Sequence, residues 1–88
     1  MPTIEAHGHL VGTIGREPLT VSGSTVREVI ESLIRRIPRA RDLLLTRTGA
    51  LSELVSIGLR DRIVGLDASV RDHDVLILIG ENIGADSE

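Results

Sequence analysis

The stretch VSGSTVREVIESL, residues 21–33, encodes an amphipathic helix with a marked start. Thr25 is followed three residues later by Glu28. This spacing is a capping box, in which the threonine hydroxyl accepts from the glutamate amide and the carboxylate reaches back. Apolar residues then recur at helical steps until Pro38 ends the pattern: Val26, Val29, Ile30, Leu33, Ile34 and Ile37. The stretch predicts one helix with a continuous apolar face.

Strands are expected before this helix. Residues 3–10 alternate between apolar and polar side chains, as in a half-buried strand. The alternation resumes at residues 18–21, after a segment that contains Gly12 and Gly15. Two strands joined by a glycine-rich loop predict a hairpin.

Further strands are expected after the helix. Residues 54–59 are strand-like, residues 60–62 form a polar turn, and residues 63–64 are a short apolar piece. Leu43–Leu45 favours a short strand or a helical turn equally. The aliphatic run at residues 75–79 has no polar alternation, which predicts the most buried strand of the sheet.

This order of elements predicts a single α+β domain. One main helix would pack on a mixed sheet over residues 1–80. Residues 81–88 carry Ile83 as their one bulky apolar side chain, so we expect them to be a flexible C-terminal tail.

The composition excludes several classes of chemistry. The 88 residues are 41% hydrophobic and carry a net charge of −3. They include no Phe, Trp, Tyr, Cys or Lys. Disulfides, thiolate metal sites, cysteine nucleophiles and lysine Schiff bases are therefore excluded. A negative chain without aromatics is a poor nucleic-acid binder. No apolar run approaches the ~20 residues that span a bilayer. We expect a soluble cytoplasmic protein without a cofactor of its own.

Several motifs together resemble the MoaD/ThiS family of sulfur-carrier proteins, which have the β-grasp (ubiquitin-like) fold. The motifs are Gly8, Gly15-Arg16, the stretch 21–33, and Asp72-x-Asp74-Val75 before the last strand, within a resemblance that spans residues 3–79. It implies a substrate rather than an enzyme: a partner adenylates the C-terminal carboxylate with ATP and converts it to a thiocarboxylate. The implied partners are an adenylating, sulfur-transferring enzyme and an acceptor enzyme of cofactor biosynthesis, docked on an exposed sheet face.

The C-terminus departs from the family pattern. The family ends in Gly-Gly because an extended backbone threads a narrow channel in which a Cβ would clash. Here the diglycine position holds Gly84-Ala85, and residues 86–88, Asp-Ser-Glu, follow. Acidic side chains near the reacting carboxylate oppose its approach to ATP phosphates. The resemblance therefore implies that the tail is processed so that Gly84 or Ala85 presents the carboxylate. The alternative is a non-carrier accessory subunit or interaction module of a larger enzyme complex.

Two turns also depart from the family pattern. The family usually has an Asn-Gly-type turn after its central strand, where this chain has Arg60-Asp61. These residues favour a type I turn or a longer loop over a type I′ hairpin. His73 stands where the family often has glycine, so we expect it to adopt a positive φ.

The remaining candidate residues also have simpler interpretations. His7 and His9 would share one strand face and could form half of a metal site with His73, but solvent-exposed histidines explain them better, so no metal is predicted. Asp72 and Asp74 are explained by turn chemistry. No catalytic residue is predicted. Five arginines cluster around the end of the helix, where some complement the helix dipole and others could contact an acidic partner: Arg35, Arg36, Arg39, Arg41 and Arg47.

Overall fold

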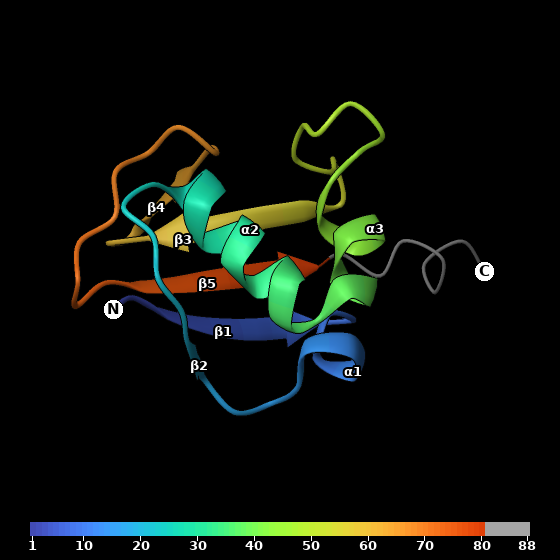
Figure 1. The fold of residues 1–88 in the computed structure, drawn as a ribbon, viewed down its shortest axis with the longest axis horizontal. Helices are drawn as coiled ribbons and strands as arrows, with labels where there is room; N and C mark the ends of the chain where they lie inside the picture. Colours follow the sequence, from blue (N-terminus) through green and yellow to red (C-terminus); the bar gives the residue numbers. More distant parts are fainter. Residues whose placement is uncertain (81–88) are drawn as a thin grey trace.

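Five strands form one mixed sheet, and helix α2 lies across one of its faces (Figure 1). The computed structural model describes residues 1–80. The elements in chain order are β1 (Thr3–Gly8), α1 (Val11–Ile14), β2 (Leu19–Thr20), α2 (Val26–Arg36), the 3₁₀ helix η1 (Pro38–Ala40), α3 (Arg41–Leu44), β3 (Val55–Leu59), β4 (Arg62–Val64) and β5 (Val75–Gly80). The strand order is β2-β1-β5-β3-β4. Only the β1·β5 pairing is parallel among the described strands. The predicted α+β architecture, a β-grasp sheet on one main helix, is confirmed.

Helix α2 begins where its capping residues predict. The Thr25 hydroxyl accepts a hydrogen bond from the Glu28 amide at 3.2 Å. The Glu28 carboxylate reaches back one residue further than in a standard capping box. It accepts from the Ser24 amide at 2.8 Å and from the Ser24 hydroxyl at 2.9 Å. The helix ends at Arg36, and Pro38 starts the tighter turn of η1.

We predict that Glu28 makes the stability of the fold depend on pH. The hydrogen bond from the Ser24 amide, followed by that from the Ser24 hydroxyl, holds the pKa of the Glu28 carboxyl below its ordinary value of 4.5. A carboxyl whose pKa is depressed by folding stabilises the fold above its unfolded pKa. That stabilisation is lost as the pH falls through the folded pKa. Glu28→Gln should therefore lower the free energy of unfolding at neutral pH, and the deficit should shrink in acid.

Urea denaturation at a series of pH values between about 7 and 3 measures this effect. Glu31→Gln is the matched control, since Glu31 lies on the same helix and its carboxylate accepts no hydrogen bond from residues 1–80. A deficit for Glu28→Gln that stays constant across the pH range would contradict the prediction.

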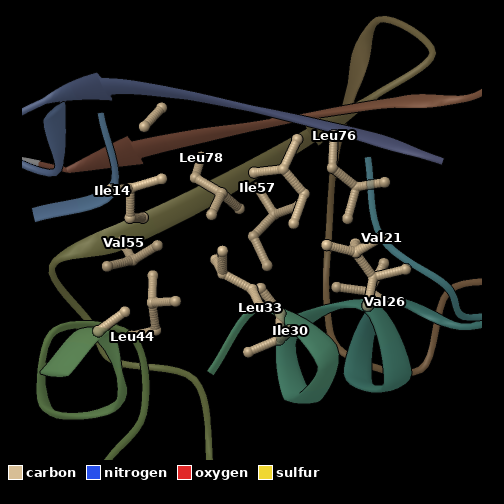
Figure 2. Close-up of a cluster of buried hydrophobic side chains, with 14 of the residues drawn as sticks. Ile14, Val21, Val26, Ile30, Leu33, Leu44, Val55, Ile57, Leu76 and Leu78 are labelled. Atoms are coloured by element: carbon tan, nitrogen blue, oxygen red, sulfur yellow. The ribbon is translucent and has the colours of Figure 1, made fainter. Parts of the chain in front are cut away.

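The core lies between α2 and the sheet and is entirely aliphatic (Figure 2). Ile57, Leu76 and Leu78 point from the sheet toward Ile30 and Leu33 of α2 (Figure 2). The other buried apolar residues complete the same cluster: Ile4, Ala6, Leu10, Ile14, Val21, Val26, Val29, Ala40, Leu44, Val55, Leu59, Leu66 and Val70. Leucine, isoleucine and valine fill most of the space, so the absence of aromatic residues does not prevent a closed core.

Strand β5 is central, as predicted, but it is buried on one face only. Leu76 and Leu78 face α2 and are 0% exposed. Val75 and Ile79 face the other way and are 39% and 38% exposed. The prediction that β5 is the most buried strand is wrong: β3 has no exposed residue, whereas no described element covers Val75 and Ile79 on the side of the sheet opposite α2.

The first strand and the connection that follows it differ from prediction. The strand expected over residues 3–10 ends at Gly8, whose φ of +71° turns the chain into the left-handed region. The connection to β2 holds a short helix, α1, within the expected loop. The β1·β2 hairpin itself is confirmed as antiparallel. The leucine run around residue 44 takes the helical alternative, as α3.

Both turn predictions are wrong. Leu59 pairs with Arg62, so Arg60 and Asp61 form a two-residue hairpin loop. Their φ values of 51° and 67° are the positive values of a type I′ turn. His73 does not adopt a positive φ, since Arg60 and Asp61 are the only non-glycine residues that do so within residues 1–80. A hydrogen bond from the Asp74 amide to the Arg71 carbonyl, at 3.1 Å, closes the turn before β5.

Within residues 1–80, none of the helices has the length and hydrophobicity needed to cross a membrane.

Candidate functional site

The face of the sheet opposite α2, which we call the open face, carries a row of aliphatic side chains. Ile77 pairs with Glu5 on one side and with Gly58 on the other, and Gly58 pairs with Ile63. Directly opposed residues project to the same side of a sheet. Ile63 is 67% exposed, and Val75 and Ile79 flank Ile77 along β5 on this same face. Exposed aliphatic side chains grouped in this way make the open face a candidate interaction surface.

A hollow opens on this face at the end formed by the β3–β4 turn. Its volume is about 510 Å³, and its apolar lining includes Leu59, Ile63, Val75 and Ile77. Gly58 also lines it and supplies no side chain. The hollow is therefore an apolar depression next to the exposed aliphatic row.

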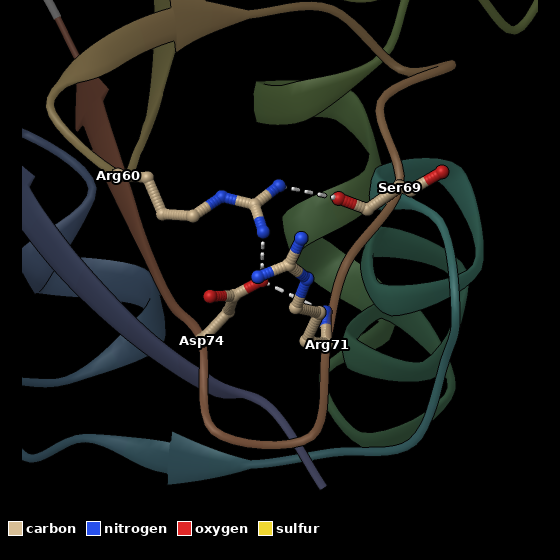
Figure 3. Close-up of polar contacts among 4 residues, drawn as sticks. All are labelled: Arg60, Ser69, Arg71 and Asp74. Atoms are coloured by element: carbon tan, nitrogen blue, oxygen red, sulfur yellow. Dashed lines mark hydrogen bonds and ion pairs between the residues drawn. The ribbon is translucent and has the colours of Figure 1, made fainter.

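Polar contacts tie the β3–β4 turn to the loop before β5, beside this hollow (Figure 3). The guanidinium of Arg60 lies 3.3 Å from the Asp74 carboxylate and donates to the Ser69 carbonyl at 3.1 Å. Asp74 also accepts a hydrogen bond from the Arg71 amide at 2.7 Å. The side chain of Asp74 is only 12% exposed. Asp74 thus joins the β3–β4 turn to the loop before β5, which supports the prediction of a turn role over an acid/base role.

Asp72 has a different environment from Asp74. Its carboxylate lies 3.9 Å from the N-terminal ammonium, and both groups are largely exposed. The two aspartates therefore do not form a carboxylate pair.

The C-terminal end of β5 is tightly packed against the end of β1. Gly80 pairs with Gly8 in the parallel ladder. A Cβ on Gly80 would lie 2.7 Å from Cε1 of His9 and 2.8 Å from Cγ of Leu10, so a larger residue would force these two side chains to move. The predicted carboxylate-presenting residues Gly84 and Ala85, with the rest of the predicted tail 81–88, lie outside the described residues.

The three histidines are not brought together. His7 lies on the open face, 3.7 Å from the Glu5 carboxylate. His9 follows the left-handed Gly8 and packs against Gly80, so the prediction that both share one strand face is wrong. Nδ1 of His9 is buried and has no hydrogen-bond partner within residues 1–80. His73 precedes β5 and lies at the opposite end of the parallel β1·β5 pair. No group of three potential metal ligands occurs in the described part of the chain.

The five predicted arginines differ in their surroundings. Arg36 donates to the Thr20 carbonyl at 2.9 Å and, with Arg39, lines a pocket beside the α1 segment. Arg35 and Arg41 line a separate pocket with Arg27. Arg47 lines neither pocket. Arg35 and Arg36 do lie in the last turn of α2, as the helix-dipole interpretation requires.

The open face and its hollow are not predicted by the sequence patterns. Because residues 75–79 are expected to form the most buried strand of the sheet, Val75, Ile77 and Ile79 are not among the predicted surface residues. The signal that could have found the hollow is Gly58, a glycine inside a strand. Glycine weakens a strand and often marks a place where another group approaches closely.

The fold is shared with solved structures of several small proteins. A chain in the crystal structure of the Amycolatopsis orientalis BexX/CysO complex matches with a TM-score of 0.81 at 23% identity, over 92% of this chain and 96% of that one. The solution structure of small archaeal modifier protein 1 from Methanosarcina acetivorans matches with a TM-score of 0.80 at 18% identity, over 92% of each chain.

A putative molybdopterin converting factor subunit 1 from Pyrococcus furiosus matches with a TM-score of 0.70 at 20% identity, over 91% of this chain and 95% of that one. No family model and no curated protein sequence matches the chain. These likenesses establish the β-grasp, ubiquitin-like fold.

Proposed function

We propose that the chain is a small ubiquitin-like protein of sulfur-carrier type that is a substrate of its partner enzymes. The observation that carries this proposal is the β-grasp fold shared over nine-tenths of the chain with CysO-complex, archaeal-modifier and molybdopterin-converting-factor structures. The MoaD/ThiS-like motifs at residues 21–33 and 72–75 support it independently.

The proposed chemistry takes place at the carboxylate of Gly84 or Ala85. Attack of this carboxylate on the α-phosphorus of ATP forms an acyl adenylate and releases pyrophosphate. Hydrosulfide (HS⁻) supplied by the partner then attacks the acyl carbon and displaces AMP, and the resulting thioacid loses its proton to become a thiocarboxylate. Residues 86–88 follow these positions, so the peptide bond after Gly84 or Ala85 must first be cleaved.

The geometry of the domain supports one docking surface for the partner enzymes. Gly84 is four residues beyond Gly80, the end of β5. Four residues span at most about 14 Å, so the carboxylate reacts close to that end of the sheet. The open face runs along β5 to the same end, and we propose it as the surface on which an adenylating enzyme and then an acceptor enzyme dock.

The test uses three purified chains that end at Gly84, Ala85 and Glu88. Each is incubated with the adenylating enzyme of the host organism and ATP, and the covalent product is followed by intact mass. We expect AMP on the chain ending at Gly84 or Ala85, formed at least about tenfold faster than on the longest chain, a difference of about 1.4 kcal/mol in the barrier. If neither shortened chain takes AMP, the carrier function is wrong. If all three react equally, the need for processing is wrong.

A non-carrier accessory subunit is the second candidate, favoured by Ala85 at the position of the second glycine. In that case, deletion of residues 84–88 would leave the activity of the host complex intact. Loss of activity on this deletion would support the carrier instead.

A further inference from the structure

The charge of the chain is divided unevenly between the domain and the residues that follow it. Residues 1–80 carry ten arginines and ten acidic side chains, so their formal charges balance. Residues 81–88 add three acidic side chains, Glu81, Asp86 and Glu88, and no basic one. The net charge of −3 therefore lies entirely beyond Gly80, in a segment attached to a domain rich in arginine.

One arginine pocket of the domain has no acidic side chain in its lining. This pocket, which we call the α1 pocket, has a volume of about 600 Å³ and is lined by residues 12–15 and 36–39. Arg36 is ordered by its hydrogen bond to the Thr20 carbonyl at 2.9 Å. The guanidinium of Arg39 makes no hydrogen bond or ion pair within residues 1–80. Two guanidinium groups without a carboxylate beside them form a site suited to carboxylates.

The other grouped arginines already have acidic neighbours. The pocket that contains Arg35 and Arg41 is also lined by Glu31, and Arg41 lies 3.9 Å from the Asp42 carboxylate. Arg60 is paired with Asp74 in the same way. An incoming carboxylate would meet repulsion as well as attraction at those arginines. The α1 pocket is therefore the more favourable acceptor for an acidic segment.

The chain leaves the domain beside the α1 pocket. The residue before α1 is Leu10, whose side chain lies against Gly80 at the end of β5. Figure 1 shows the end of β5 and α1 at the same end of the domain. Helix α1 spans four residues, or about 6 Å, and contacts η1, which carries Arg39. Asp86 is six residues beyond Gly80, a reach of at most about 20 Å, so its carboxylate can enter the pocket.

We propose that the acidic extension, residues 86–88, binds to the α1 pocket of its own domain and holds residues 84–85 against it. The two side-chain carboxylates of the extension pair with the guanidinium groups of Arg36 and Arg39. Because the extension is already attached, its effective concentration at the pocket is in the millimolar range, so ion pairs too weak to join separate molecules populate the bound state. The bound extension shields the peptide bond after Ala85. That cleavage of this bond releases a carrier rests on the proposed function, whereas the contact itself does not.

A spin label on the extension tests the contact. The chain contains no cysteine, so Ser87→Cys in the 88-residue protein creates a single attachment site. At low salt we expect the label to broaden the ¹⁵N-detected amide signals of the α1 pocket, at Thr13 and Arg39. Asp86→Asn combined with Glu88→Gln should lower the ratio of bound to free extension by roughly 2- to 30-fold, the effect of losing two exposed ion pairs. The broadening should fall accordingly.

Asp61→Asn combined with Asp67→Asn is the matched control, since it changes the net charge by the same amount. Both carboxylates belong to exposed residues. Asp61 lies in the β3–β4 turn, at the opposite end of β3 from Val55, which pairs with Gly80. This control should keep the broadening of the parent protein. Absence of broadening in the parent, or equal broadening with and without the carboxylates of the extension, would overturn the proposal.

Limited proteolysis with proteinase K, followed by intact mass, tests whether the contact shields the extension. Arg39→Glu and Arg47→Glu carry the same extension, so the sequence preference of the protease does not affect their comparison. Both arginines are exposed, but Arg47 does not line the α1 pocket. We expect Arg39→Glu to be cleaved within residues 84–88 roughly 2- to 30-fold faster than the wild type, and Arg47→Glu at the wild-type rate. Equal rates for the two variants would contradict the shielding. Neither measurement involves adenylation, so the contact and the carrier function can fail separately.

Discussion

Gly8→Ala should leave little folded protein, whereas Gly12→Ala should fold as well as the wild type or better. A Cβ on Gly8 would overlap the carbonyl oxygen of Gly80 across the β1·β5 pairing. The φ of +71° at Gly8 adds the strain of a left-handed residue, about 1 kcal/mol. The overlapping atom belongs to the backbone, so relief requires β1 and β5, the central pair of strands, to separate at their C-terminal ends. We expect a total loss above about 4 kcal/mol, a large part of the stability of a small domain.

Gly12 is the matched control because it lies in α1, where a Cβ would meet no atom within 4 Å and φ is not left-handed. Alanine at this position should stabilise the fold by about 0.4 to 1 kcal/mol. Urea denaturation followed by far-ultraviolet circular dichroism compares the two variants with the wild type. Similar unfolding midpoints for Gly8→Ala and Gly12→Ala would contradict the prediction. They would show that a Cβ on Gly8 fits beside Gly80 without separating β1 from β5.

Local signals make α2 predictable from the sequence. Thr25, Glu28 and Pro38 mark its ends, and its apolar period is long enough to define a face. Helix α1 spans only four residues, too few for a period to show, and the sequence does not predict it. An apolar period thus predicts a helix only when the helix is long enough for the period to repeat.

The β3–β4 turn shows how tertiary contacts override turn preferences. Arg60 and Asp61 are not the residues that normally adopt two successive positive φ values. The turn is nevertheless held, because Arg60 is tied to Asp74 and to Ser69 on the facing loop. Arg60 and Asp74 are fourteen residues apart, so no local pattern could have shown this contact.

The candidate site is only partly predictable for a related reason. An exposed sheet face is expected for docking, but which residues form it depends on what covers each side of the sheet. The run Val75–Ile79 is aliphatic on both sides, since one side meets the core and the other forms the open face. Composition alone cannot distinguish a strand buried on both faces from one that offers a docking surface.

Leu33→Ala should cost about 3 to 5 kcal/mol of unfolding free energy, the range for a fully buried leucine that leaves a cavity. Leu33 is 0% exposed and lies in the middle of the cluster between α2 and the sheet (Figure 2). Side chains of both layers surround it, including Ile30 on the helix and Ile57 on β3 (Figure 2). These neighbours are anchored in the helix and the strand, so they can collapse into the cavity only in part.

Ile34→Ala is the matched control, one residue further along the same helix. Ile34 is partly buried and packs at the edge of the core. Its truncation removes less buried surface, and alanine is the better helix former, so we expect a loss of about 1 kcal/mol. Urea denaturation of both variants gives the comparison. Equal losses would mean that the apolar face of α2 is centred away from Leu33, and that the helix sits on the sheet in a different rotation from the one described.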